Sequence, residues 1–217
     1  MNMFTDSIAE RHLKELAARY PSLESVAESI DQVYAALKTC FLNDKVLFCA
    51  GNGGSAADSE HIVGEMMKGF LLRRPLNEVL TQLIKQRTGD DTLAGRLQMG
   101  LRCISLLSHP ALNSAFMNDV DPDMIFAQQL FVLGRIGDAV IGITTSGNAK
   151  NVCNLFKVAR ARGITTILLT GSRRGCCADF ADLMIQVPER ETYKVQELHL
   201  PVYHCLCAML EENFYGK

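Results

Sequence analysis

The sequence lacks the features that mark membrane, secreted and broadly nucleic-acid-binding proteins. None of its apolar runs reaches the length that a bilayer-spanning helix needs. A formal net charge of −2 gives no broad electrostatic hold on nucleic acid. The opening residues show no basic segment followed by an apolar one, so we expect no secretory signal. These absences favour a cytoplasmic protein with no nucleic-acid or membrane partner.

Cysteine is plentiful, but its usual site patterns are missing. The chain has no C-x-x-C pair and no zinc-finger spacing. Most of its cysteines lie within apolar runs, where a thiol behaves as a small apolar side chain. We therefore expect reduced, structural cysteines, as in a cytosolic protein. The eight positions are Cys40, Cys49, Cys103, Cys153, Cys176, Cys177, Cys205 and Cys207.

The chain is long enough for one domain with a sizeable core, at 217 residues and 48% hydrophobic content. Apolar runs alternate with helical patterns, which predicts a parallel, doubly wound α/β sheet with helices on both faces. The expected strands cover residues 46–50, 103–107, 139–144, 165–170 and 182–187.

Two further segments stand outside this alternation. Residues 5–39 show two amphipathic helical stripes separated at Pro21. Because this hairpin has more apolar surface than one strand covers, we expect it to contribute to a subunit interface. Residues 77–101 suggest two short helices around a turn. His109 and Pro110 suggest another turn.

A glycine-rich loop, Gly51 to Ser55, follows the first expected strand and leads into a helix. Glycines let main-chain N–H groups approach a ligand, and Ser55 is a reasonable N-cap. Free N–H groups and the helix dipole make such a turn an anion site. On the same helix His61 and Glu65 lie four residues apart, on one face. The sequence thus places a potential phosphate-binding loop close to an imidazole and a carboxylate.

A second loop, Thr144 to Asn148, is rich in hydroxyl groups and also precedes a helix. Hydroxyl donors and free N–H groups suit a phosphate monoester without a P-loop lysine. Ordinary turn and cap chemistry is the alternative explanation. Both loops would leave the sheet at the carboxyl ends of its strands, where ligands bind in such folds.

The last expected helix, residues 193–214, carries Gln196 and His204 roughly on one face. With His61 and Glu65 they make a plausible four-ligand set for a divalent transition metal. Alternatively, Glu65 and His204 form an acid–base pair that moves a proton through an enediol. A third interpretation, in which His204 is simply a core histidine, also stays open.

Four stretches resemble the sugar isomerase (SIS) domain superfamily, and within it the sedoheptulose 7-phosphate isomerases, or phosphoheptose isomerases. They are G-N-G-G-S-A-A-D-S-E-H-I-V-G-E (51–65), N-D (118–119) with I-F (125–126), G-I-T-T-S-G-N-A-K-N-V (142–152) and V-Q-E-L-H-L-P-V-Y-H (195–204). The resemblance implies one SIS domain over residues 1–217. It implies a three-layer α/β/α sandwich, flavodoxin- or Rossmann-like, with a five-stranded parallel sheet. It also implies a homotetramer with sites at subunit interfaces and residues 1–40 in its core.

The resemblance further implies an isomerase, an intramolecular oxidoreductase that interconverts aldose and ketose phosphates. Glu65 would be the base and His204 the acid, acting on sedoheptulose 7-phosphate to give D-glycero-D-manno-heptose 7-phosphate. One zinc ion per site would be held by His61, Glu65, Gln196 and His204. The residues implied in substrate binding are Asn52, Gly53, Ser55, Asp119, Thr144, Thr145, Ser146, Asn148 and Gln196.

Three departures from the family pattern leave an alternative. Ala149 stands where the family usually adds a serine to the phosphate loop, and residues 68–74 differ from its usual Gly-Arg-aromatic-Arg segment. Residues 77–101 look like an insertion. These features favour a non-catalytic, phosphosugar-binding or protein-interacting SIS module, of the type that associates with the bacterial replication initiator. The intact Glu65 and His204 favour the enzyme.

Overall fold

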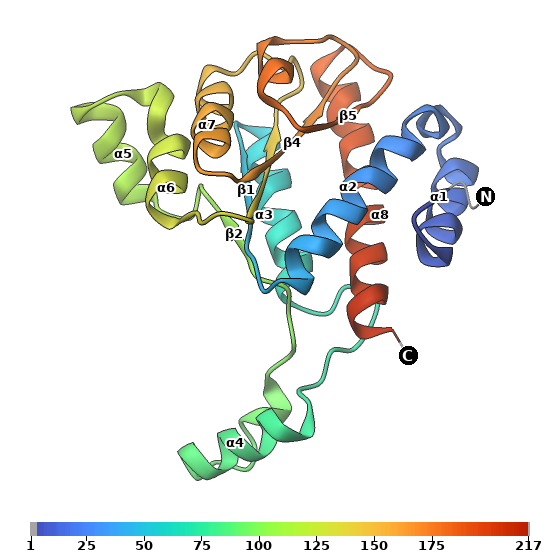
Figure 1. The fold of residues 1–217 in the computed structure, drawn as a ribbon, viewed down its shortest axis with the longest axis vertical. Coiled ribbons are helices and arrows are strands. Elements are labelled where there is room, and N and C mark those ends of the chain that lie inside the picture. The colour runs from blue at the N-terminus through green and yellow to red at the C-terminus, as the bar shows by residue number, and fades with distance from the viewer. Residues whose placement is uncertain (1–3, 217) are drawn as a thin grey trace.

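The computed structural model describes residues 4–216, which form a five-stranded sheet between two layers of helices (Figure 1). All pairs are parallel, in the order β2-β1-β3-β4-β5. This is the flavodoxin-like order of doubly wound sheets. The predicted fold class is therefore confirmed. The strands are β1 (Leu47–Gly51), β2 (Cys103–Ser105), β3 (Ala139–Ile143), β4 (Thr165–Thr170) and β5 (Leu183–Gln186).

Alternate residues of each central strand enter different cores, because successive strand side chains point to opposite faces. Leu47 and Cys49 of β1 join one buried cluster, with side chains of the three helices on that face and of α1 (Ser7–Arg19). Phe48 and Ala50 join the other, with side chains of two helices on the opposite face. The first layer comprises α2 (Ala27–Leu42), α3 (Gly54–Met67) and α8 (Thr192–Tyr215), and the second comprises α6 (Ile125–Leu133) and α7 (Lys150–Ala161).

The apolar faces of the N-terminal helices are buried within the same chain. The short 3-10 helix η1 (Pro21–Val26) joins α1 (Ser7–Arg19) to α2. Leu13 of α1 and Ile30 and Leu37 of α2 are at most 1% exposed, in the same cluster as α8. The surplus apolar surface expected from the sequence is thus buried within one chain. The oligomerisation role of residues 1–40 stays a prediction. The apolar surface that suggested this role does not support it, because that surface is already buried.

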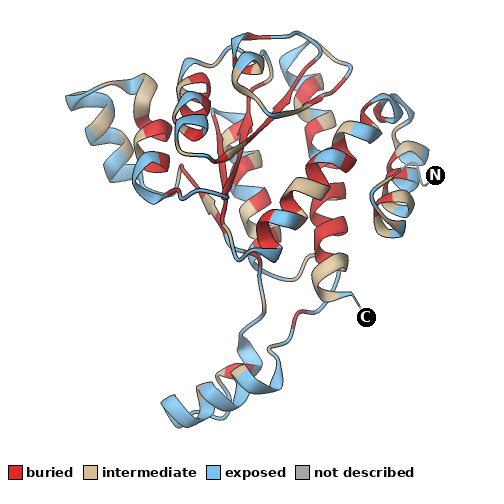
Figure 2. Ribbon diagram, viewed as in Figure 1, coloured by how far each residue is buried: buried red, intermediate tan, exposed pale blue. Residues whose placement is uncertain are grey.

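The segment at 77–101 stands away from the rest of the molecule (Figure 1). It contains α4 (Glu78–Thr88), which is the first of the two predicted helices. A single 3-10 turn, η2 (Ala94–Arg96), stands where the second helix was predicted. No residue of α4 is buried, as its pale blue ribbon in Figure 2 shows. We refer to residues 77–96 as the α4 arm. Within residues 4–216, neither this helix nor any other has the length and apolar character to cross a bilayer.

The prediction missed one helix altogether. Residues 110–119 form α5 (Pro110–Asp119), where the sequence suggested only a turn at His109 and Pro110. Pro110 occupies the first position of the helix, where proline is favoured because its missing N–H would have no intrahelical partner. A proline taken to mark a turn therefore marks a helix start. The remaining 3-10 helices are η3 (Pro122–Met124) and η4 (Cys176–Phe180).

A buried ion pair joins the end of α3 to α8. Arg74 and Glu211 are 2% and 1% exposed, and Arg74 Nε lies 2.8 Å from Glu211 Oε1. The other guanidinium nitrogens donate to the carbonyls of Met66 at 2.7 Å and Glu65 at 3.0 Å. The Glu211 carboxylate also accepts the N–H groups of three successive residues, Phe70, Leu71 and Leu72. These bonds fix the turn that follows Glu65 against the last helix.

The pKa of Glu211 reflects this environment. Burial raises it, but the hydrogen bonds from Phe70, Leu71 and Arg74 outweigh burial, so the pKa lies below its usual value. The carboxylate is therefore ionised and fully partnered. A buried charge pair is tolerated when its remaining hydrogen-bonding groups are satisfied in this way.

We expect Glu211→Gln to lower the free energy of unfolding by about 3–5 kcal/mol, because it leaves the Arg74 charge buried without its partner. Urea denaturation measures the change. The matched control, Lys14→Met, removes an exposed Lys14–Glu10 pair and should cost less than about 1 kcal/mol. Equal, small losses in the two variants would contradict a central role for the buried pair.

Candidate functional site

Helices α3 and α8 begin in direct contact, and this contact sets the geometry of the site. A Cβ atom at Gly54 would lie 3.0 Å from Gln196 Cδ and closer still to its Nε2, so the glycine leaves room for the Gln196 amide in this position. Further along, His204 of α8 meets His61 of α3. At 1.5 Å per residue, His61 lies about 10 Å along α3 from Gly54. A small molecule could therefore contact the glycine loop at one end and the imidazole cluster at the other.

His61 is the centre of a cluster of titratable side chains. Its Nε2 lies 3.3 Å from Glu65 Oε1 and 3.4 Å from His204 Nε2. The other carboxylate oxygen of Glu65, Oε2, accepts a hydrogen bond from Lys68 Nζ at 2.8 Å. The structure thus brings the carboxylate and imidazole predicted from distant parts of the sequence to one place. Lys68 is a member of the cluster that the sequence analysis did not assign.

Hydrogen bonds behind His61 determine where its proton lies. Tyr203 donates its hydroxyl hydrogen to Asp58 Oδ1 at 3.2 Å, and its oxygen lies 3.0 Å from His61 Nδ1. Because the hydroxyl hydrogen of Tyr203 is used in the bond to Asp58, the tyrosine oxygen is free to accept a hydrogen bond from His61 Nδ1–H. A neutral imidazole then presents a lone pair at Nε2. That lone pair faces Glu65 and His204, an arrangement that favours a cation or a shared proton between them.

Asp58 and Tyr203 are therefore part of the site, although sequence reasoning missed both. Burial raises the pKa of Asp58, and burial followed by the charge of Asp58 raises the pKa of Tyr203. A phenol that stays protonated can keep donating to the carboxylate. The signal for both residues was present, since they lie inside the two stretches that carry His61 and His204.

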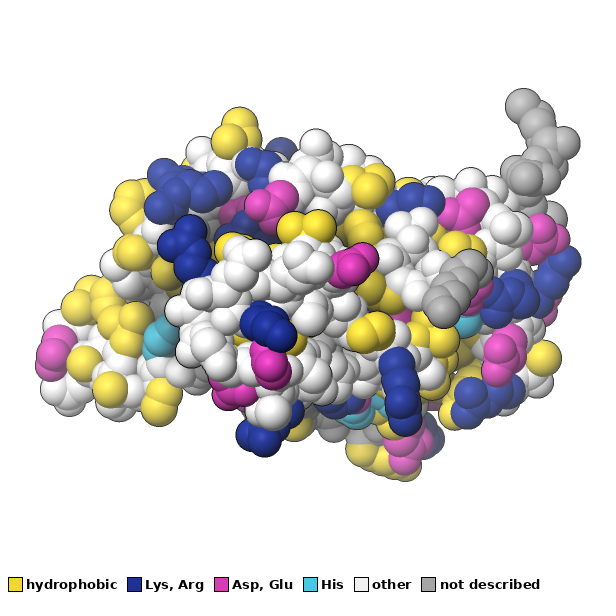
Figure 3. Space-filling model, turned by 90° about the horizontal axis from the view of Figure 1, so that it is seen from below, with side chains coloured by type: hydrophobic (Ala, Val, Ile, Leu, Met, Phe, Trp, Pro, Cys, Tyr) yellow, Lys and Arg dark blue, Asp and Glu magenta, His cyan; other side chains and the backbone are white. Residues whose placement is uncertain are grey.

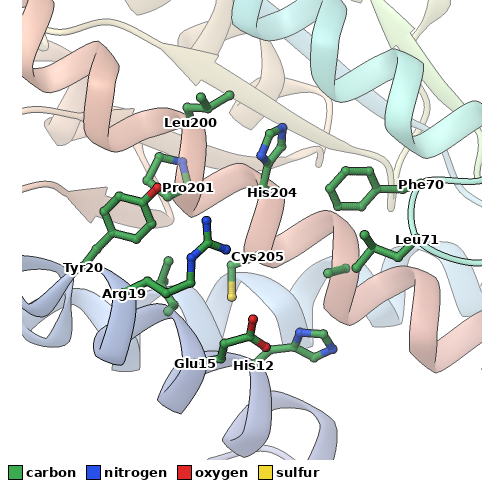
Figure 4. A pocket seen from close by; sticks show the side chains of 12 residues that line it. His12, Glu15, Arg19, Tyr20, Phe70, Leu71, Leu200, Pro201, His204 and Cys205 are labelled. Carbon is green, nitrogen blue, oxygen red and sulfur yellow. The ribbon is translucent and has the colours of Figure 1, made fainter.

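His204 opens on a groove rather than lying in the core. The groove has a volume of about 360 Å³ and runs between α1 and α8 (Figure 4). Glu15 and Arg19 reach into it from α1, and Phe70 and Leu71 close one end. The interpretation of His204 as a core histidine is thus wrong. Burial, followed by the neighbouring imidazole of His61, lowers the pKa of His204, so its imidazole is neutral near neutral pH.

The fully buried histidine is His199, one turn earlier on α8. It is 0% exposed, and neither ring nitrogen has a hydrogen-bond partner among residues 4–216. Burial lowers its pKa to about 4, and the nearby Thr170 backbone offsets only part of this. The Thr170 hydroxyl is also buried without a partner. His199 is therefore a neutral imidazole beneath the strand ends.

The glycine loop begins its helix earlier than expected. Gly53, with a φ of 55°, is the N-cap of α3, and no side chain caps the helix. Ser55 is a helical residue, 4% exposed, so the prediction that it caps the helix was wrong. The positive φ of Gly53 turns the chain one residue after Asn52. The next N–H groups are already used, since Ser55 donates to the Asn52 carbonyl and Ala56 to the Gly53 carbonyl, both at 3.0 Å. The N–H of Gly54, at the first position of the helix, is the one in this turn that an anion could use.

A reciprocal amide pair joins the two candidate loops. Asn52 Nδ2 donates to Asn151 Oδ1 at 3.0 Å, and Asn151 Nδ2 donates to Asn52 Oδ1 at 2.9 Å. Asn151 lies on α7, directly after the hydroxyl-rich loop. The sequence analysis did not assign it, although it lies within the matching stretch 142–152. The pair holds the start of α3 beside the start of α7.

The hydroxyl-rich loop is a turn at the end of β3. Thr144 is 6% exposed, Thr145 is half-buried, and Ser146 and Asn148 are exposed. Asn148 N–H donates to Ser146 Oγ at 3.2 Å, and the Asn148 side chain donates to the Ser146 carbonyl at 3.0 Å. The loop therefore presents exposed polar groups beside a helix N-terminus, as predicted for phosphate.

Asp119 stands apart from the other predicted residues. It lies at the end of α5, on the outer side of the molecule beyond α6 (Figure 1). Among residues 4–216, the hydrogen bond to its side chain comes from the adjacent Asn118, at 2.8 Å. One chain therefore does not bring Asp119 to the His61 cluster.

Comparison with known proteins assigns the chain to a family. Residues 113–209 match the SIS domain family. The chain is 33% identical over 219 residues to phosphoheptose isomerase of Burkholderia pseudomallei, covering 100% of this chain and 97% of the relative. The chain belongs to the phosphoheptose isomerase family. Phosphoheptose isomerase of Akkermansia muciniphila is 32% identical, covering 93% and 94% of the two chains.

Solved structures of phosphoheptose isomerases share the fold. The Neisseria gonorrhoeae protein superimposes with a TM-score of 0.72 at 28% identity, covering 94% of this chain and 97% of that one. The Francisella tularensis protein gives a TM-score of 0.74 at 24% identity, covering 95% and 97%, a likeness of fold. The likeness covers at least 94% of the chain, whereas the SIS match begins after α3.

The described residues include one group whose ligand atoms already converge enough to hold a metal ion. It consists of Cys153, Cys176 and Cys177, whose sulfurs all lie within 4.8 Å of one another. The predicted zinc ligands His61, Glu65 and His204 do not form such a group, because Glu65 and His204 approach His61 Nε2 from different directions. Gln196 lies against Gly54, nearer to the glycine loop.

The buried His199 predicts a dependence of stability on pH. Its folded pKa of about 4 lies below its ordinary 6.5, so the stabilisation is complete above pH 6.5 and is lost as the pH falls towards 4. The loss should reach about 3 kcal/mol at the lower limit. His199→Leu should lack this component, measured as the difference between the urea unfolding free energies of the two proteins across that range. A difference that does not change with pH would contradict the assignment.

Proposed function

We propose that this protein interconverts sedoheptulose 7-phosphate and D-glycero-D-manno-heptose 7-phosphate by proton transfer through an enediol. The observation that carries the proposal is the meeting of Glu65 and His204 at His61. Relatives that match the whole chain are phosphoheptose isomerases. The acid–base pair lies about 10 Å along α3 from the glycine loop, which the Asn52–Asn151 pair holds beside the hydroxyl-rich loop. This separation suits a sugar that carries its phosphate at the far end.

Glu65 acts as the base. In the ketose, its carboxylate removes a proton from C1, and the electrons of that C–H bond form the C1–C2 double bond of the enediol. The same carboxyl group returns the proton to C2 to give the aldose. Lys68 holds one carboxylate oxygen, which leaves Oε1 to face the site. General bases of this kind contribute about 10²–10⁴-fold to a rate.

His204 moves the hydroxyl proton. As C1 loses its proton, the imidazole donates a proton to the C2 carbonyl oxygen. It then takes the proton from the C1 hydroxyl as C2 is reprotonated, and the C1 aldehyde forms. The lowered pKa of His204 keeps the ring neutral, so one ring nitrogen carries a hydrogen to donate and the other can accept a proton.

The two loops hold the rest of the substrate. Thr144, Thr145, Ser146 and Asn148 supply donors for the phosphate beside the N-terminus of α7. Around the sugar stand Asn52, Gly53, Ser55 and Gln196. Asp119 lies apart from them in one chain, so its contact with the sugar depends on a second subunit.

The donor set of the cluster fits zinc. The lone pair of His61 Nε2 faces the Glu65 carboxylate, and zinc accepts imidazole nitrogen and carboxylate oxygen. His61, Glu65, Gln196 and His204 would hold the ion. When bound, zinc would polarise the carbonyl and hydroxyl oxygens of the sugar. Tyr203 would orient His61 from behind, as partners of metal-bound histidines do.

The second candidate is a protein-interacting SIS module without catalysis. The observation in its favour is the α4 arm, which has no buried residue in α4 and projects from the domain. The exposed arm has no use in the proton transfer. An assay for aldose–ketose exchange separates the two candidates directly.

We expect Glu65→Gln to reduce isomerisation by at least about 100-fold, because an amide cannot act as the base. Exchange between sedoheptulose 7-phosphate and the aldose, assayed with and without zinc, measures the loss, and calorimetry should show that sugar-phosphate binding survives. The matched control is Glu60→Gln on the same helix, whose side chain bonds Ser108 instead. Unchanged turnover in Glu65→Gln, or no exchange by the unaltered protein, would overturn the proposed reaction.

We further propose a cytoplasmic homotetramer with its sites at subunit interfaces. Apolar side chains gather over α5 and α6, at the left of Figure 3. Val120, Phe131 and Val132 there are 66%, 56% and 56% exposed, an arrangement typical of interaction surfaces. The eight cysteines are all free thiols, which suits a reducing compartment.

Light scattering coupled to gel filtration should give four times the mass of the chain, and activity per chain should fall on dilution below the assembly range. The double variant Phe131→Glu/Val132→Glu should lower the mass if the apolar surface over α5 and α6 is an interface. A fully active monomer would rule out sites built between subunits.

A further inference from the structure

Three cysteine thiols converge on the side of the molecule that carries the hydroxyl-rich loop. Cys153 lies in the first turn of α7, and Cys176 and Cys177 begin η4. All three sulfurs lie within 4.8 Å of one another. Cys153 and Cys177 are buried, whereas Cys176 is exposed. The cluster is therefore half enclosed, with one side open to solvent.

The turn that carries two of these thiols is bonded directly to the hydroxyl-rich loop. Cys177 N–H donates to the Gly147 carbonyl at 2.9 Å, and Cys176 N–H donates to Asn148 Oδ1 at 3.0 Å. Gly147 has a φ of 69°, and a Cβ there would lie 2.9 Å from Gly175 N, so the two turns pack backbone against backbone. The positions of the thiols and the shape of the loop are thus set together.

The chemistry of the cluster selects soft ions. Sulfur ligands favour zinc, copper(I) and similar thiophilic cations over magnesium or calcium. Burial, followed by the neighbouring Cys176 thiol, raises the pKa of Cys153, so this thiol is protonated until an ion displaces its proton. The exposed side at Cys176 leaves room for entry and for a fourth ligand, as in metal sites that keep one open position.

We propose that Cys153, Cys176 and Cys177 form a three-thiolate site for a soft divalent cation, and that its occupation weakens phosphate binding at residues 144–148. The second part rests on the proposed function of that loop. Binding of the ion releases three thiol protons to solvent. Two positive charges and three thiolates leave a net charge of −1 beside the loop. Like charges repel, so a phosphate should bind there less well.

Cadmium is a suitable probe, because thiolate ligation gives an ultraviolet charge-transfer band that nitrogen and oxygen ligands do not. The reduced, full-length protein is titrated with Cd²⁺ in the absence of oxygen. We expect the band to saturate at one ion per chain. Cys176→Ser should lose at least about tenfold in affinity, since one of three ligands is removed. Because Cys176 is exposed, this variant should fold normally.

Two controls isolate the cluster. Cys40→Ala removes a buried thiol outside the trio and should leave the band unchanged. His204→Gln removes a member of the proposed zinc set and should also keep it. Absence of the band in the unaltered protein, or an unchanged band in Cys176→Ser, would overturn the thiolate site. This result does not depend on isomerase activity.

The coupling to the loop has its own readout. With the site saturated by Cd²⁺, the KM for the sugar phosphate should rise severalfold in the unaltered protein, and not in Cys176→Ser. The Cys40→Ala control should behave like the unaltered protein. An unchanged KM at a saturated band would overturn the coupling. If the protein shows no isomerisation, calorimetric titration with inorganic phosphate, with and without Cd²⁺, tests the same repulsion.

Discussion

The ion pair between Arg74 and Glu211 holds together the part of the molecule on which the site depends. Arg74 binds the last carbonyls of α3, and Glu211 binds the turn that follows them, so both ends of the contact are fixed to α8. Glu65 lies on the last turn of α3, and His204 lies two turns before Glu211 on α8. A shift of one helix against the other would separate these side chains. The pair at one end and the Gly54–Gln196 contact at the other prevent that shift.

This arrangement also explains a departure from the family pattern. The resemblance noted from the sequence implies a different segment at residues 68–74, with arginines at other positions. In the structure Arg74 points inward and is 2% exposed, so its role is structural. Lys68, not an arginine, supplies the positive charge next to Glu65. The altered segment thus keeps a charged partner for the carboxylate and stabilises the helix pair.

Much of the fold was predictable because its signals are local. Buried strands appear as short apolar runs, and both loops carry glycine or hydroxyl residues at strand ends. The meeting of His61, Glu65 and His204 was not derivable from spacing, because it depends on how α3 and α8 pack; resemblance to a family supplied it. Asp58 and Tyr203 were missed because their bond joins the same two helices. The cysteine trio was missed because Cys153 is distant in sequence from Cys176 and Cys177, and only the turn at Gly147 brings them together.

The α4 arm has a consequence for how the chain tolerates change. An isolated helix of 11 residues is marginal in water, and α4 receives no support from the core. Its amide hydrogens should therefore exchange with solvent far faster than those of the sheet. A protease that cuts there would leave the doubly wound domain intact. The same independence means that this segment can vary in length and composition between related proteins while the catalytic helices stay in place.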